Sequence, residues 1–165
     1  MQNFLPIIIV ICAICLVIGP VMMLKPSNRA KREAALRTEA AKQGLLVSLR
    51  DAADDGKRVC YQLPLEADKH GARAEWELSQ KKFQHELHFD KYWDWCKQEQ
   101  LPDKARYDAL RDYVEHLPAS VCGIGENRAG LYLLWREKGL GDDVQAAIAS
   151  LLALLMELKR VLARP

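Results

Sequence analysis

The chain has 165 residues, of which 50% are hydrophobic and 28% are charged, and its formal net charge is +2. This length accommodates one compact domain beside a shorter segment. Nine glycines and seven prolines are too few for a collagen-like or low-complexity chain, and apolar residues that continue through the whole sequence exclude a disordered chain.

The first stretch of the chain is apolar throughout. Residues 4–24 contain no charged side chain, and as a helix they would be roughly 31 Å long, which matches the hydrocarbon core of a bilayer. A cleaved signal peptide is the alternative, but no basic residue precedes the run and no small-residue cleavage motif follows it. We therefore expect a transmembrane helix at residues 4–24 that anchors the protein.

A cluster of cations follows directly. Six Lys and Arg against two Glu give residues 25–44 a net charge of +4, and the first of these cations are Lys25, Arg29, Lys31 and Arg32. Because positive charges favour the cytoplasmic side of a membrane, the cluster predicts a single-pass protein of the bacterial inner membrane. Its N-terminus is expected outside and its C-terminal domain in the cytoplasm. The basicity is local, so it gives no reason to expect nucleic-acid binding.

Residues 25–44 are also expected to form a basic juxtamembrane helix, in which Ser27 or Asn28 is the N-cap and Gly44 follows the last turn. Two roles for its cations remain open. They bind anionic lipid headgroups, or they enforce topology on a stalk that continues the membrane helix. Leu36 is the only large apolar residue of this segment, and the lack of a broad apolar face favours the stalk.

Residues 45–165 predict a cytoplasmic domain of the α+β class, with a small, mostly antiparallel sheet covered by two helices. Residues 45–50 and 58–63 have the composition of strands and flank a polar turn, which indicates a hairpin. The segment 75–89 fits either two short strands about a turn at residues 80–82 or one helix, and both interpretations stay open.

The elements of the second half are clearer. A 3.6-residue apolar stripe predicts a helix over residues 101–117. Residues 121–125 and 131–136 flank a polar turn and indicate a second hairpin, whose apolar second strand is expected at the centre of the sheet. A last helix is predicted from Asp142 onward, with its apolar face on the sheet. Its apolar residues follow a 4-3-4-3-4 spacing: Val144, Ile148, Leu151, Leu155, Leu158 and Leu162.

No motif in the sequence points to catalysis. His85 and His88 are three residues apart, whereas two zinc ligands on one helix face need a spacing of four. Gly123 and Gly125 lack the third glycine and the Lys-Ser or Lys-Thr pair of a phosphate-binding loop. We therefore expect no enzyme activity, no metal or other cofactor, and no small-molecule substrate.

Aromatic residues are concentrated in the segment 89–95, and two interpretations of this segment are open. The aromatic side chains belong to the domain core, or Tyr92, Trp93 and Trp95 form a docking surface for a partner, because aromatic residues are enriched at interface hot spots. The docking surface is the most informative functional hint in the sequence.

A single apolar span that ends at Leu24-Lys25-Pro26, followed by a charged helix and a small β-containing domain, resembles the YajC-type accessory subunit of the bacterial Sec preprotein translocase over residues 4–50. The whole chain also resembles an uncharacterised bacterial family of single-span inner-membrane proteins. These resemblances imply an inner-membrane location and, for the first, a part in protein transport.

From these patterns we expect a membrane-anchored, non-enzymatic accessory or scaffold protein of an inner-membrane complex. Its expected partners are the lipid bilayer and another inner-membrane protein. A YajC-like translocase subunit and a membrane-tethered enzyme or metal sensor are the alternatives.

Overall fold

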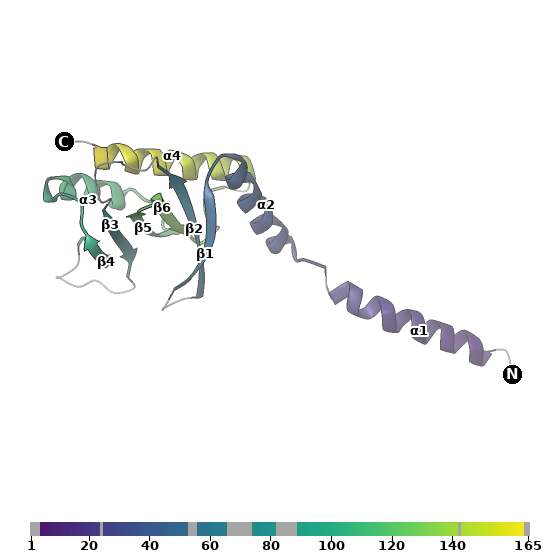
Figure 1. The fold of residues 1–165 in the computed structure, drawn as a ribbon. Helices are drawn as coiled ribbons and strands as arrows, with labels where there is room; N and C mark the ends of the chain where they lie inside the picture. Colours follow the sequence, from purple (N-terminus) through teal and green to yellow (C-terminus); the bar gives the residue numbers. More distant parts are fainter. Residues whose placement is uncertain are drawn as a thin grey trace. The chain divides into compact units, whose positions relative to one another are not determined.

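The chain divides into two compact units, Met1–Glu33 and Ala34–Pro165. The computed structural model describes residues 4–23, 25–52, 56–65, 74–81, 89–141 and 143–163. Its helices and strands are labelled in chain order in Figure 1. The first unit contains helix α1 (Phe4–Met23) and the start of helix α2 (Asn28–Lys42), and the second contains the rest of α2 and all of the strands.

The expectation of a membrane anchor is not met. None of the helices in these described ranges combines the length and the hydropathy that a membrane crossing requires. The predictions of a transmembrane helix at residues 4–24 and of a single-pass inner-membrane protein with a cytoplasmic domain are therefore wrong.

Helix α2 begins and ends at its capping residues. Ser27 is the N-cap, because its Oγ accepts a hydrogen bond of 3.1 Å from the backbone N–H three residues later. At the other end Gly44 has a φ of +82°, and the backbone N–H of Leu45 donates to the carbonyl of Ala40 at 3.0 Å. This is the hydrogen bonding of a Schellman motif, and it turns the chain from α2 directly into the first strand.

Six antiparallel strands form one sheet in the order β1-β2-β6-β5-β3-β4. Their bounds are β1 Leu46–Ala52, β2 Gly56–Pro64, β3 Glu75–Gln80, β4 Trp93–Gln100, β5 Val121–Asn127 and β6 Gly130–Trp135. The strands β1 and β2 form one hairpin and β5 and β6 the other. Strand β6 is central and buried along its whole length, while β1 and β4 are the two edges of the sheet.

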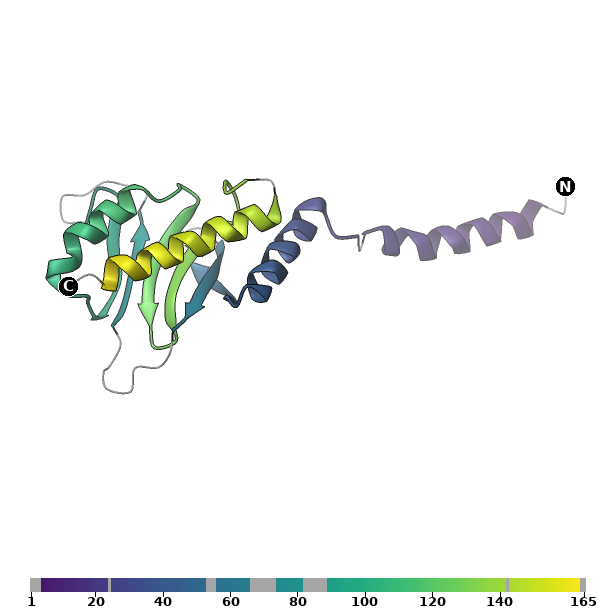
Figure 2. The same cartoon turned by 90° about the horizontal axis from the view of Figure 1, so that it is seen from above.

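Helices α3 (Tyr107–Glu115) and α4 (Val144–Ala163) pack on one face of this sheet, and α4 crosses the strands diagonally (Figures 1 and 2). A short 3-10 helix, η1 (Lys104–Arg106), precedes α3. The apolar stripe of α4 is buried in the core, and α4 contacts both α3 and β6. Asp143 caps α4, because its Oδ2 accepts a hydrogen bond of 2.8 Å from the N–H of Ala146. The predicted cap, Asp142, lies outside the described residues.

The C-terminal half of α2 is a third covering helix, where the sequence predicts two. Leu36 and Ala40, one turn apart, are fully buried in the same core as α4. Arg37 lies between them and donates two hydrogen bonds, of 2.9 and 2.7 Å, to the carboxylate of Glu137. The hydroxyl of Tyr61 on β2 donates to the same carboxylate at 2.7 Å. The sequence carries no local signal for this packing. Leu36 is a lone large apolar residue, and the Arg37–Glu137 contact beside it joins residues 100 positions apart in the sequence.

Strand β4 is absent from the sequence-based prediction for a physical reason. Beyond Trp95 its residues are exposed and polar, and two register shifts interrupt its pairing with β3, so no apolar alternation marks it as a strand. Residues 75–80 form the strand β3, which decides the first half of the helix-or-strand question at 75–89. Residues 82–88 lie outside the described residues.

On the face of the sheet opposite the helices, two glycines of β5 leave space for side chains of β6. A Cβ on Gly125 would lie 2.5 Å from the ring of Tyr132, and one on Gly123 would lie 2.6 Å from Cδ1 of Leu134. Tyr132 therefore reaches across β5 to β3, where its hydroxyl donates to Glu77 at 2.8 Å. The Gly-x-Gly spacing at 123–125 thus serves packing within the sheet.

Replacing Arg37 with Ala tests how much the Glu137 contact stabilises the domain. The change leaves a carboxylate that is 5% exposed without this cation. Loss of one partner of a buried pair costs about 3–5 kcal/mol, and Arg37 is itself 34% exposed, so we expect the free energy of unfolding in urea to fall by about 2–3 kcal/mol.

The matched control is Arg29→Ala, which breaks the exposed Arg29–Glu33 pair on the same helix and should cost about 0.5 kcal/mol or less. Equal losses for the two variants would mean that the Arg37–Glu137 contact does not hold α2 in place.

Candidate partner-binding surfaces

The three aromatic residues predicted to dock a partner lie in different surroundings. Tyr92 is 46% exposed in the turn that precedes β4, whereas Trp93 is 5% exposed and belongs to the core. Trp95 is half-buried and packs against the core. Tyr92 is therefore the exposed one of these three aromatic residues, while the docking role of all three remains a prediction.

Trp95 lies at the centre of an aromatic cluster. Its ring centroid is 5.7 Å from that of Trp76 on β3, 4.9 Å from that of Phe89 and 5.8 Å from that of Tyr107 on α3. Edge-to-face and tilted pairs at these distances are favourable beyond the area that they bury. The cluster joins β3, β4 and α3, which gives Trp95 a structural role.

The turn before β4 contacts α3 through two residues of that helix, Arg111 and Glu115, which lie one helical turn apart. The ammonium of Lys91 pairs with the carboxylate of Glu115, and this hydrogen bond raises the pKa of Lys91 and lowers the pKa of Glu115. Arg111 donates to the backbone carbonyl of Phe89 at 3.2 Å and lies over the ring of Phe89. Tyr92 is thus presented on a turn that α3 holds in place.

The edge strand β1 exposes apolar side chains on both faces of the sheet. Leu46 is 54% exposed and Leu49 is 56% exposed, and Val47 is partly buried against the core. The free N–H and C=O groups of an edge strand can pair with another chain. Edge strands of native proteins usually carry charged residues or proline, which prevent this pairing. In β1 the charge at residue 50 is already paired within the domain, as the guanidinium of Arg50 bonds Glu77 at 3.3 Å.

The opposite edge, β4, has the usual protection. Its residues 96–100 are all exposed and include Lys97 and Glu99 among polar neighbours. The two register shifts in its pairing with β3 also make its outer edge irregular. The sheet therefore has one protected edge, β4, and one edge, β1, that exposes two leucines.

Arg50 fixes the side chains on the face of the sheet opposite the helices. Its guanidinium lies 4.5 Å from the centroid of the Tyr132 ring and bonds Glu77, which also accepts the Tyr132 hydroxyl. Burial, together with the negative charge of Glu77, raises the pKa of Tyr132, so the phenol is neutral at any physiological pH. This network orders the strands β1, β3 and β6 beside the exposed Leu46.

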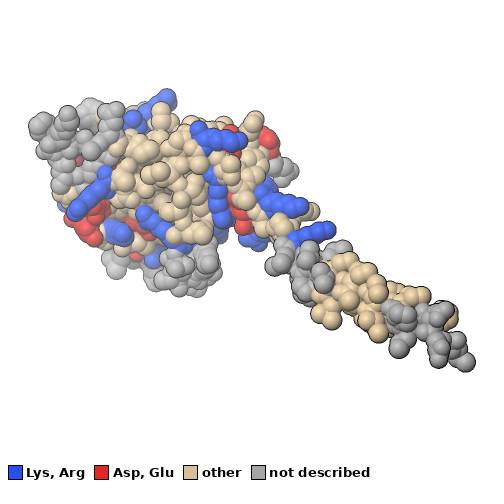
Figure 3. Space-filling view, turned by 45° about the vertical axis from the view of Figure 1, so that its right-hand side comes forward, with Lys and Arg blue, Asp and Glu red and all other residues tan. Residues whose placement is uncertain are grey.

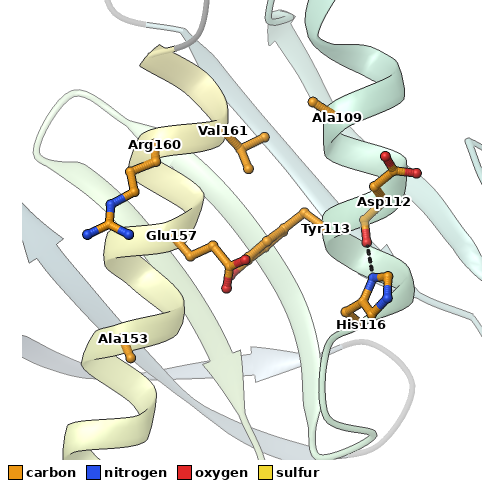
Figure 4. Close-up of a pocket in the computed structure, with 8 residues that line it drawn as sticks. All are labelled: Ala109, Asp112, Tyr113, His116, Ala153, Glu157, Arg160 and Val161. Atoms are coloured by element: carbon orange, nitrogen blue, oxygen red, sulfur yellow. Dashed lines mark hydrogen bonds between the residues drawn. The ribbon is translucent and has the colours of Figure 1, made fainter.

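A groove of about 460 Å³ lies between α3 and α4 (Figure 4). Tyr113 reaches from α3 toward α4, and its hydroxyl donates to the carbonyl of Leu154 at 2.9 Å. Burial and the nearby carboxylate of Glu157 raise the pKa of this hydroxyl. His116 bonds the backbone carbonyl of Asp112 at 2.6 Å. These contacts join the two helices and cap the end of α3.

The cysteine and histidine candidates give no metal centre within the part of the chain that is described, where no group of three or more metal-ligating side chains comes together. His85 and His88 lie outside the described residues. Cys60 and Cys122 are buried, and burial raises the pKa of both thiols. Thiols in such surroundings are inert structural residues.

The four cations singled out at the start of the chain lie in or just before α2. Lys25, Arg29 and Lys31 are exposed, and Arg32 is half-buried. Figure 3 shows Lys and Arg side chains over this part of the chain and no charged side chains over the described part of α1. Their role at a membrane surface, and the lipid bilayer as a partner, stay predictions.

Comparisons with family models, curated proteins and solved structures give no match for this chain. The resemblance to YajC-type subunits is therefore neither supported nor excluded by them.

Sequence reasoning missed the β1 edge. Apolar residues at positions 46, 47 and 49 fall on both faces of a strand, a pattern typical of a central strand. Only the pairing order places β1 at the end of the sheet, where the same residues become an accessible surface. No local signal distinguishes the two positions.

Replacing Trp93 and Tyr92 singly with Ala separates the core residue from the exposed one. The loss of a buried tryptophan leaves a cavity, so Trp93→Ala should lower the free energy of unfolding by about 3–5 kcal/mol. Tyr92→Ala removes a half-exposed ring and should change it by about 1 kcal/mol or less. Urea unfolding of the full chain measures both, and a large loss for Tyr92→Ala would show that Tyr92 is part of the core.

Proposed function

We propose that the unit Ala34–Pro165 is a non-enzymatic scaffold or accessory module that binds another polypeptide strand along β1. The observation that carries this proposal is the exposure of Leu46 and Leu49 on an edge strand of a sheet whose other edge is polar. An apolar edge offers backbone groups for hydrogen bonds and side chains for apolar contact. This combination is used by domains that recognise peptides through strand addition.

Each face of β1 offers one apolar anchor to an added strand. Leu46 lies opposite Gln62, and Leu49 lies opposite Val59, in register with β2. Since side chains alternate along a strand, a bound segment with apolar residues on both faces contacts both leucines. Burying the exposed half of each leucine contributes on the order of 1 kcal/mol, and cross-strand pairs add about 0.2–1 kcal/mol each.

The β1 edge is already ordered before a partner arrives. Strand β1 is paired with β2 along its whole length, from Leu46 opposite Gln62 to Ala52 opposite Gly56. Its first residue follows the Gly44 turn that ends α2. A preformed edge lowers the entropic cost of binding, because only the added strand has to be ordered.

The other functions expected from the sequence stay predictions. A YajC-like translocase subunit needs a translocase as its partner, and an enzyme or metal sensor needs a catalytic or metal-binding group. Among the described residues, the exposed apolar side chains of β1 favour binding of a polypeptide over these alternatives. We therefore retain the non-enzymatic scaffold.

The proposal is tested with a fluorescein-labelled heptapeptide that alternates threonine and valine, titrated with the full chain and followed by fluorescence anisotropy. Its valines lie on one face and its threonines, whose side chains carry a methyl group, lie on the other, so each leucine of β1 meets a β-branched side chain. Saturable binding is expected. The same peptide with N-methyl groups on alternate residues keeps its side chains and loses the N–H groups of one edge, so it should bind at least tenfold more weakly.

Two variants of the chain complete this test. Leu49→Lys places a charge on the edge and should weaken binding about tenfold, whereas Leu101→Lys changes an exposed apolar residue outside the sheet and should bind as the parent does. Equal affinities for the methylated and unmethylated peptides, or for the two variants, would contradict strand addition at β1.

A further inference from the structure

We infer that the strand that occupies the β1 edge is β1 of a second copy of this chain, in an antiparallel pair centred on Ser48. This inference rests on the proposed function, because it names the partner of the same edge. It follows from the way in which the sequence of β1 complements itself.

Symmetry restricts how two copies of β1 pair. A two-fold axis perpendicular to the sheet joins the copies with their helices on the same side, so that the sheet continues from one copy into the other. Residues directly opposite each other then lie on the same face, and side chains alternate between faces along the strand. The axis must therefore lie midway between the two copies of one residue. Near the middle of β1 this residue is Val47, Ser48 or Leu49.

The pair centred on Ser48 matches side chains on both faces. On the face covered by the helices, Leu49 of each copy lies opposite Val47 of the other, which joins four apolar side chains in one stripe. On the opposite face Leu46 lies opposite Arg50, whose methylene groups can cover it. Each guanidinium keeps its contacts with Glu77 within its own copy, and like charges are not opposed.

The other two centres fit less well. An axis through Leu49 places Asp51 opposite Val47 and leaves an apolar residue against a charged one. An axis through Val47 places Leu49 opposite Leu45, which is buried in the core of its own copy and precedes the strand. Matching of apolar residues therefore selects Ser48.

The size of this contact indicates reversible association. A pair over residues 46–50 joins two edges of five residues each, and small contacts of this kind are typical of transient complexes. The two copies are expected to exchange freely, so chains with different substitutions form mixed pairs when they are combined.

Cysteine cross-linking tests both the partner and the register. In a chain whose exposed Cys12, Cys15 and Cys96 are replaced by Ser, one preparation carries Val47→Cys and a second carries Leu49→Cys. On mixing in a non-ionic detergent, with copper phenanthroline as the oxidant, two thiols lose two electrons and two protons and form one disulfide. The mixed dimer should exceed the dimers of either preparation alone by at least fivefold.

The geometry explains this expectation. Residue 47 of one copy lies directly opposite residue 49 of the other, where the Cβ atoms of a strand pair are about 4.5–5.5 Å apart. Two copies of residue 47, or of residue 49, are offset by two positions, at about 7–8 Å, which is beyond the reach of a disulfide. Detergent covers the exposed apolar side chains of α1, which are the same in all preparations.

Two results would overturn the inference. Equal cross-linking in the mixed and single preparations would indicate random collision, and preferential cross-linking of Leu49→Cys with itself would move the axis to Leu49. If cross-linking fails while the threonine-valine peptide still binds, a second copy is not the partner and strand addition stands. If neither occurs, the proposed function fails as well.

Discussion

The position of β1 depends on one ion pair, in which half-buried Arg37 meets the buried carboxylate of Glu137. Glu137, two residues after the end of β6, has a φ of +54°, a backbone conformation that costs free energy for a residue other than glycine. Its carboxylate accepts hydrogen bonds from Arg37 of α2 and from Tyr61 of β2. These bonds hold α2 on the sheet, and because α2 turns directly into β1 at Gly44, they also fix where the edge strand begins.

The two edges of the sheet differ in a way that packing alone does not require. Beyond Trp95, β4 presents exposed polar side chains and an irregular register, which prevent pairing with another chain. Strand β1 presents Leu46 and Leu49, while its Arg50 faces Glu77 inside the domain. An edge that is held in place, apolar and regular is suited to binding a strand.

The sequence predicted the elements that bury a periodic apolar face, such as α4 and the hairpin of β5 and β6, because local spacing alone determines such a face. The order of the strands, and with it the edge position of Leu46 and Leu49, depends on pairing between distant residues. The packing of Leu36 depends on the Arg37–Glu137 contact, which also has no local signal. For α1, the absence of charge led to the prediction of a membrane span, which is wrong for the described residues.

The central claim is that the outer edge of β1 is open in the single chain and is covered by an added strand. Residue-resolved hydrogen exchange by NMR, with the full chain dilute and then saturated with the threonine-valine peptide, tests it most directly. Alternate amides of β1 should exchange rapidly in the dilute chain and at least tenfold more slowly with peptide, while the amides of β4 stay unchanged. Slow exchange of every β1 amide in the dilute chain, or protection by the peptide at β4 or at the α3–α4 groove, would contradict the claim.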